Sequence, residues 1–192
     1  MEILFSLKTH IFKVFIIRRV DDIQDSSELR RGVPSSYTIY GAPPSMNASA
    51  YVMTDVTHRV HNVFRDANVL LTFVKYVKFI HMSQGMDLYY RDIQCNKDDL
   101  KEANIPTEEE YNKILVYKTA GQLMMMATLL GAKSKTGIDV VPLAQIIGHH
   151  FQIRDDYLNI MSKQYEEKKG FCDDLVEGKF SLPVIFALHL PY

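Results

Sequence analysis

The sequence is poor in the residues that mark several protein classes. Its two cysteines, Cys95 and Cys172, are far apart and suggest neither a disulfide framework nor a CxxC metal site. A net charge of −1 excludes the broad basic field of a nucleic-acid-binding protein. With only seven prolines and nine glycines, it is not a low-complexity chain. We therefore expect a reduced, cytoplasmic protein that binds no nucleic acid.

Long apolar runs are also missing, although 47% of the residues are apolar. No run reaches the roughly 18 apolar residues that cross a bilayer, so we expect no transmembrane segment. The apolar, basic start of the chain contains Glu2 and few serines, which argues against a transit peptide. We expect residues 1–19 to form a divergent N-terminal helix and residues 1–192 to form a single domain.

Strand patterns are scarce, whereas helical periods recur along the chain. Thr107 followed by three glutamates is typical of a helix start. Residues 32–45 have the prolines and glycines of a turn-rich connector, and residues 92–106 read as a polar loop. The fold class predicted is all-α, with helices over residues 3–26, 47–61, 66–91 and 107–130 and from Pro142 onward.

The first acidic cluster lies in VDDIQDSSELRRG, residues 20–32. Asp21 and Asp25 are four residues apart on one predicted helix face, with Asp22 beside the first, and like charges at this spacing destabilise a helix. A solvated acidic face explains such a cluster about as well as a cation site does. A bound cation would turn the repulsion into attraction.

A second acidic cluster, FQIRDDYLN at residues 151–159, shifts that balance. Gln152, Asp155, Asp156 and Asn159 recur at helical spacing and share one face of an apolar helix, which solvated acids do not need. Hard cations such as Mg²⁺ bind carboxylates and commonly complete their shell with substrate phosphates. Basic residues suited to phosphate are present as well, and together with the two acidic faces they suggest a metal–diphosphate site: Arg30, Arg31, Lys118, Lys169 and Lys179.

Five stretches together resemble the trans-prenyl diphosphate synthases, and in particular eukaryotic and fungal geranylgeranyl diphosphate synthases. The similarity covers about residues 20–188. The resemblance implies a helical bundle of the isoprenoid synthase type around a deep central cavity, with the two aspartate-rich motifs facing each other. The stretches are DDIQDSSELRRG, SQGMDLYYRD, KT at Lys118 and Thr119, FQIRDDYLN and KGFCDDLVEGKFSLPVI.

The resemblance also implies a reaction and a role for each matching residue. A homo-oligomer would condense isopentenyl diphosphate with an allylic diphosphate to give geranylgeranyl diphosphate, with Mg²⁺ as cofactor. The metal ligands would be Asp21, Asp25 and Asp155, supported by Asp22, Asp156 and, through water, Asp174. The allylic diphosphate would be bound by Arg30, Lys118, Thr119, Gln152, Lys169 and Lys179. Arg31 would serve isopentenyl diphosphate, and Gln84 with Asp87 would line the cavity. The catalytic residues would be Asp21, Asp22, Asp25, Lys118 and Asp155.

Three alternatives stay open. A class I terpene cyclase uses the same ionisation, but FQIRDDYLN followed by KGFCDD is the synthase form of the motif. Arg18 and Arg19 precede the first aspartate, where the family has apolar or hydroxylic residues, and residues 1–17 lack the family's upstream basic segment. The chain also stops soon after EGKFSLPVIFAL. A domain truncated at both ends is therefore expected, as a catalytically impaired fragment or as a non-catalytic partner subunit.

Overall fold

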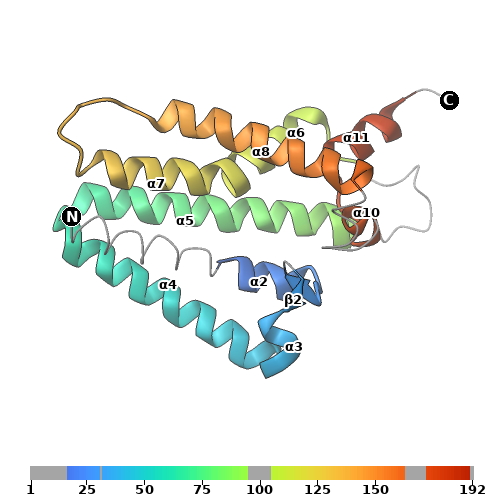
Figure 1. Cartoon of the computed structure of the whole chain (residues 1–192), viewed down its shortest axis with the longest axis horizontal. Coiled ribbons are helices and arrows are strands. Elements are labelled where there is room, and N and C mark those ends of the chain that lie inside the picture. Colours follow the sequence, from blue (N-terminus) through green and yellow to red (C-terminus); the bar gives the residue numbers. More distant parts are fainter. Residues whose placement is uncertain (1–16, 31, 95–104, 163–171, 191–192) are drawn as a thin grey trace. The chain divides into compact units, whose positions relative to one another are not determined.

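The computed structural model describes residues 17–30, 32–94, 105–162 and 172–190, and they are mostly helical (Figure 1). The predicted all-α class is thus confirmed. The chain divides into two compact units, Met1–Val74 and Lys75–Tyr192. The deep central cavity and the single domain remain predictions, and most of the predicted N-terminal helix lies outside the described residues.

The first unit is built on short elements that follow the first acidic cluster. Its helix α2 ends at Gln24, close to the predicted end. After it comes a two-residue antiparallel ladder that the sequence did not predict, in which Arg30 pairs with Val33. Gly32 closes this hairpin with φ +80°, a conformation that L residues other than glycine rarely adopt. The elements are α2 (Ile17–Gln24), β1 (Leu29–Arg30), β2 (Val33–Pro34), α3 (Ser36–Tyr40) and α4 (Ala42–Phe64).

The prediction of a connector over residues 32–45 was wrong. This stretch holds β2, α3 and the start of α4, which begins at Ala42 rather than at residue 47. Pro43 and Pro44 lie in the first turn of α4, where a missing N–H breaks no intrahelical hydrogen bond and the fixed φ of proline suits the helix. The same prolines therefore start the helix instead of interrupting it.

The second unit consists of long helices. Helix α5 (Ala67–Leu88) runs across the boundary between the units and continues into the wide turns of η1 (Tyr89–Gln94). The polar loop predicted over residues 92–106 was therefore wrong at residues 92–94, and residues 95–104 lie outside the described residues. Helices α6 and α7 are joined without a break by the π-helical η2. The remaining elements are α6 (Glu108–Leu115), η2 (Val116–Ala120), α7 (Gly121–Gly131), α8 (Val141–Met161), α10 (Asp173–Val176) and α11 (Leu182–His189).

The predicted start of α6 at Thr107 is confirmed. The Thr107 hydroxyl accepts a hydrogen bond from the Glu110 backbone N–H, and the Glu110 carboxylate accepts one from the Thr107 N–H at 2.8 Å, which is a complete capping box. These hydrogen bonds satisfy two of the N–H groups that a helix start leaves open. The Thr107 N–H, followed by the Tyr90 hydroxyl, lowers the pKa of Glu110.

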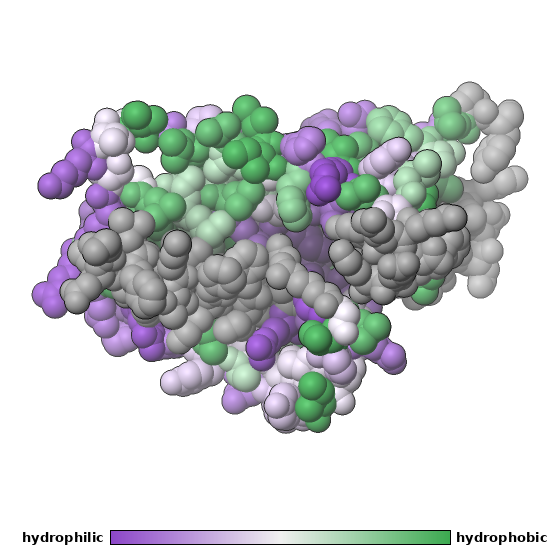
Figure 2. All heavy atoms as spheres, viewed as in Figure 1, coloured by the Kyte–Doolittle hydropathy of each residue, from purple (hydrophilic) through white to green (hydrophobic). Residues whose placement is uncertain are grey.

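Both units contain buried apolar side chains. In the first unit, Val56, Val60 and Phe73 are buried. In the second, Tyr111 and Leu115 of α6 pack with Ile185 of α11. Helix α7 buries Met125, as expected of a methionine run that fills a core. Figure 2 shows hydrophobic surface in the region of helix α8. The exposed apolar side chains of this helix include Leu143, Ile146, Ile147, Phe151, Tyr157 and Met161.

Within the part of the chain that the structure describes, one helical stretch, Glu108–Gly131, is long and apolar enough to cross a membrane by length and composition alone. Core helices of soluble proteins meet the same criterion, and about a third of the most apolar part of this stretch is buried inside the fold. The expected absence of a transmembrane segment therefore stays a prediction.

Candidate functional site

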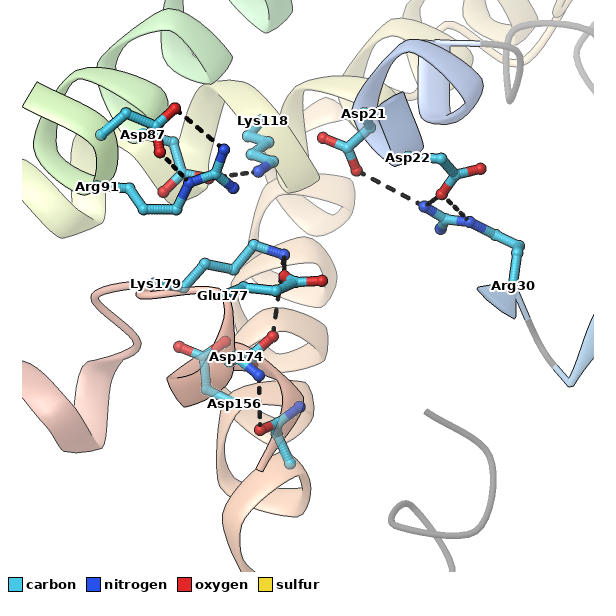
Figure 3. Close-up of polar contacts among 12 residues, drawn as sticks. Asp21, Asp22, Arg30, Asp87, Arg91, Lys118, Asp156, Asp174, Glu177 and Lys179 are labelled. Carbon is cyan, nitrogen blue, oxygen red and sulfur yellow. Dashed lines mark hydrogen bonds and ion pairs between the residues drawn. The ribbon is translucent and has the colours of Figure 1, made fainter. Parts of the chain in front are cut away.

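The first acidic cluster is tied to the hairpin that follows it. Asp22 is buried, and its Oδ1 accepts hydrogen bonds from Arg30, with Nε at 2.5 Å (Figure 3). The same guanidinium lies 3.9 Å from Asp21 Oδ2. Burial raises the pKa of Asp22, and the Arg30 guanidinium opposes that shift. Because the hairpin holds Arg30 in place, one cation balances the two neighbouring carboxylates.

Asp21 and Asp25 lie four residues apart at the end of α2. The Asp25 N–H donates to the Asp21 backbone oxygen at 2.8 Å, and the chain then leaves the helix through Ser26 in the left-handed conformation. The Asp21 side chain is about one-fifth exposed, whereas Asp25 is buried. Their predicted role as metal ligands stays a prediction.

Among the residues that the structure describes, no three acidic, histidine or cysteine side chains are grouped closely enough to hold a metal ion. Mg²⁺ does not need three protein ligands, because it commonly binds through one or two carboxylates and completes its octahedral coordination with water and substrate phosphates. The donor chemistry of Asp21 and Asp25 fits an ion of that kind. A closed protein site, such as a structural zinc centre, does not fit the described residues.

The second unit brings a set of predicted substrate-binding residues together. Lys118 Nζ lies 2.5 Å from Asp87 Oδ2, and both side chains are about one-fifth exposed (Figure 3). The Thr119 hydroxyl donates to Gln152 Oε1 at 2.6 Å. We name these residues, Asp87, Lys118, Thr119 and Gln152, the lysine–threonine cluster. It combines a half-buried ammonium group with a hydroxyl and an amide, which are suitable donors for phosphate oxygens.

Gln84 lies one helical turn before Asp87 and is buried. Neither its amide nitrogen nor its amide oxygen has a hydrogen-bond partner among the described residues. Leaving such a buried group unsatisfied costs about 1–3 kcal/mol, and a polar ligand would remove that penalty. The predicted place of Gln84 in a binding cavity is consistent with this orphaned amide.

Asp156 is buried and its carboxylate is satisfied by three donors. Oδ2 accepts from the Tyr111 hydroxyl at 2.7 Å and the Leu182 N–H at 3.0 Å, while Oδ1 accepts from Gln152 Nε2 at 2.7 Å. Burial raises the pKa of Asp156, and burial followed by the nearby Asp156 charge raises that of Tyr111. These contacts favour a structural role, because Asp156 joins α6 and α8 to the start of α11.

Sequence reasoning missed Tyr111 and Leu182 because they lie 45 and 26 residues from Asp156. The N-cap of α11, Ser181, makes no side-chain hydrogen bond to its own helix, so the α8 carboxylate supplies the cap from outside. The neighbouring Asp155 is half-buried and remains the better candidate for a metal ligand on this helix.

The remaining predicted residues lie after α8. The Asp174 N–H donates to Asn159 Oδ1 at 3.3 Å, and Lys179 Nζ lies 4.0 Å from Asp174 Oδ1. Lys179 also pairs with Glu177, a contact that the sequence did not predict (Figure 3). Lys179 is thus held close to its own acidic segment. Lys169 and Arg31 lie outside the described residues.

Comparison with known proteins decides the family. The sequence model of the polyprenyl synthetase family matches residues 11–191, which is most of the chain. The chain belongs to the polyprenyl synthetase family. The predicted resemblance is therefore confirmed, and this prenyltransferase family typically uses divalent metal ions.

Relatives of this chain include fungal geranylgeranyl pyrophosphate synthases. It is 42% identical over 170 residues to the one of Mucor circinelloides f. lusitanicus, covering 88% of this chain and 52% of the relative. The corresponding enzyme of Penicillium canescens is 40% identical, with 88% and 48% covered. A bifunctional sesterterpene synthase of Talaromyces wortmannii is 43% identical over 176 residues, with 88% and 22% covered. The chain thus spans about half the length of the geranylgeranyl pyrophosphate synthases.

Proposed function

We propose that this polyprenyl synthetase condenses isopentenyl diphosphate with an allylic diphosphate, such as dimethylallyl, geranyl or farnesyl diphosphate, to form geranylgeranyl diphosphate. The observation that carries the proposal is the lysine–threonine cluster, in which Lys118 and Thr119 of η2 meet Asp87 of α5 and Gln152 of α8. The identity of about 40% with fungal geranylgeranyl pyrophosphate synthases supports the product. We also propose that the protein works in the cytoplasm as a homo-oligomer.

The chemistry needs charge stabilisation more than a nucleophile. When the allylic carbon–oxygen bond breaks, positive charge develops on carbon and negative charge on the diphosphate. Lys118, Thr119 and Gln152 now donate to Asp87, Gln152 and Asp156 and would exchange these partners, wholly or in part, for oxygens of the departing diphosphate. Donors directed at charge that develops in the transition state stabilise it. The double bond of isopentenyl diphosphate then attacks the allylic carbon, and the new carbon–carbon bond is followed by loss of a proton.

Divalent metal would add to the charge stabilisation that these side chains supply. Asp21, Asp25 and Asp155 would hold Mg²⁺, which when bound supplies Lewis-acid stabilisation of the diphosphate. Arg30 balances the charge of Asp21 and Asp22, so the first cluster carries less net repulsion than its three carboxylates suggest. Lys118 starts paired with Asp87 and would exchange that partner, wholly or in part, for a phosphate oxygen.

The test is a product assay on the purified chain. Isopentenyl diphosphate is incubated with each allylic diphosphate, with Mg²⁺ or with EDTA, and the prenyl alcohols are separated after dephosphorylation. A C20 product that requires Mg²⁺ supports the proposal. Diphosphate binding without any condensation would support the impaired fragment or the non-catalytic subunit instead.

A terpene cyclase is the second candidate. Its support is the 43% identity with a bifunctional sesterterpene synthase, of which this chain covers 22%. When geranylgeranyl diphosphate or a longer prenyl diphosphate is supplied as the substrate, a cyclase would release cyclic hydrocarbons without consuming isopentenyl diphosphate.

A further inference from the structure

Helix α8 and the π-helical η2 approach each other unusually closely at Gly148. A Cβ atom added to this buried glycine would lie 2.4 Å from Ala120 Cα, 2.5 Å from Ala120 Cβ and 3.1 Å from Ala120 N. Cβ atoms in proteins essentially never come within 3.0 Å of another heavy atom. Two of the three atoms belong to the backbone, so no change of rotamer would make room. In this packing, position 148 accepts only glycine.

The close approach lies beside the lysine–threonine cluster. Ala120 is the last residue of η2, and Lys118 and Thr119 immediately precede it in the same wide turn. Gln152, the partner of Thr119, follows Gly148 by four residues and therefore shares its face of α8. The backbone contact and the Thr119–Gln152 hydrogen bond thus belong to one interface between the same two elements.

Ala120 ends a π-helical turn. Such a turn inserts an extra residue into a helix, and turns of this kind occur frequently at functional sites. Here Lys118 is directed to Asp87 on α5 and Thr119 to Gln152 on α8. Any force that pushes η2 away from α8 would move both side chains together.

We propose that Gly148 is a positioning residue, which lets η2 pack against α8 so that Lys118 and Thr119 are held in place for a diphosphate. The inference rests on the proposed function, because it gives these two side chains a diphosphate to bind. An added methyl group would need a separation of at least 3.4 Å instead of 2.4 Å, so the two elements would move apart by about 1 Å. Misplacement of catalytic groups by about 1 Å can lower a rate by about 100-fold.

The experiment compares two glycine-to-alanine substitutions. Gly148→Ala is tested against Gly131→Ala on α7, where an added Cβ would meet nothing within 4 Å. Titration calorimetry with inorganic diphosphate and Mg²⁺ should show binding weakened by about 10- to 100-fold in Gly148→Ala, the loss expected when hydrogen bonds to a charged ligand are broken. Binding to Gly131→Ala should equal that of the parent. A folded Gly148→Ala chain that binds like the parent would overturn the inference and leave the proposed function standing.

A second comparison separates positioning from a general loss of packing. Gly148→Ala is added to a chain that already carries Lys118→Ala and Thr119→Ala. If Gly148 acts through these two side chains, the addition should weaken diphosphate binding by less than twofold. A further loss as large as that seen in the parent background would contradict the inference.

Two controls keep the inference testable if a variant or the ligand fails. If Gly148→Ala does not fold, the double variant Gly148→Ala with Ala120→Gly is measured instead. It removes the contact with the Cβ atom at position 120 but keeps the contacts with the backbone there, so diphosphate binding should remain weaker than in the parent. Binding as strong as in the parent would overturn the inference. If the parent binds no diphosphate, the proposed function fails. Amide hydrogen exchange then tests the packing role. Faster exchange over residues 116–120 in Gly148→Ala, but not in Gly131→Ala, supports this role, and unchanged exchange overturns it.

Discussion

Replacing Asp156 with alanine tests whether this carboxylate stabilises the fold or serves only as a metal ligand. The substitution leaves three donors without their acceptor, namely the Tyr111 hydroxyl, the Gln152 amide and the Leu182 N–H. Each unsatisfied buried donor costs about 1–3 kcal/mol. Part of that cost is offset because the unfavourable burial of the Asp156 charge, which raises its pKa, disappears as well. We expect a loss of about 3–5 kcal/mol in unfolding free energy, because the cost of three unsatisfied donors is only partly offset.

The assay is urea unfolding followed by circular dichroism at neutral pH in EDTA, so that no divalent metal contributes. Asp155→Asn is the matched control, because this neighbouring residue makes none of the three contacts, and its cost should stay below about 1 kcal/mol. Tyr111→Phe removes one of the hydrogen bonds and should cost about 1–1.5 kcal/mol. If Asp156→Ala costs less than about 1 kcal/mol in EDTA, the structural reading of this carboxylate is wrong.

Three further outcomes are expected. Thr107→Ala should lower the unfolding free energy by about 1 kcal/mol, because it removes the N-cap of α6; an unchanged urea midpoint would contradict this. Burial and the Glu110 carboxylate raise the pKa of Tyr90 to about 12, and burial also raises the pKa of Tyr111. Because these tyrosines keep their protons longer in the folded than in the unfolded chain, their contribution to the unfolding free energy is complete below about pH 10 and is lost as the pH rises toward 12. Alkaline melting curves test this, and a melting temperature that stays level over that window would refute it. Lys118→Ala should weaken Mg²⁺–diphosphate binding by about 1.5–3 kcal/mol in calorimetry, whereas Lys113→Ala on the exposed surface of α6 should leave binding unchanged. Equal effects of the two substitutions would show that Lys118 does not bind the diphosphate.

Local signals predicted the parts of the fold that depend on neighbouring residues. The capping box at Thr107 and the proline near the start of α8 are encoded within four residues, and both helices begin where expected. Pro43 and Pro44 misled the prediction because proline suits a turn and the first turn of a helix equally well. Only the path of the following chain decides between the two.

Long-range packing explains what the sequence could not show. The wide turn of η2 coincides with the crossing of Gly148 and Ala120, and nothing in VYKTA alone marks it as different from an ordinary helix. The helical spacing of Gln152 and Asp156 correctly placed them on one face, and the structure links them directly. That spacing could not reveal that the Asp156 carboxylate already accepts hydrogen bonds from donors on α6 and α11.

Binding of farnesyl diphosphate to the purified chain, measured by titration calorimetry with and without Mg²⁺, is the most direct test of a metal-dependent diphosphate site. We predict saturable binding in Mg²⁺ that is lost in EDTA and weakened by Lys118→Ala. Binding of equal strength in EDTA, or no binding in Mg²⁺, would contradict it.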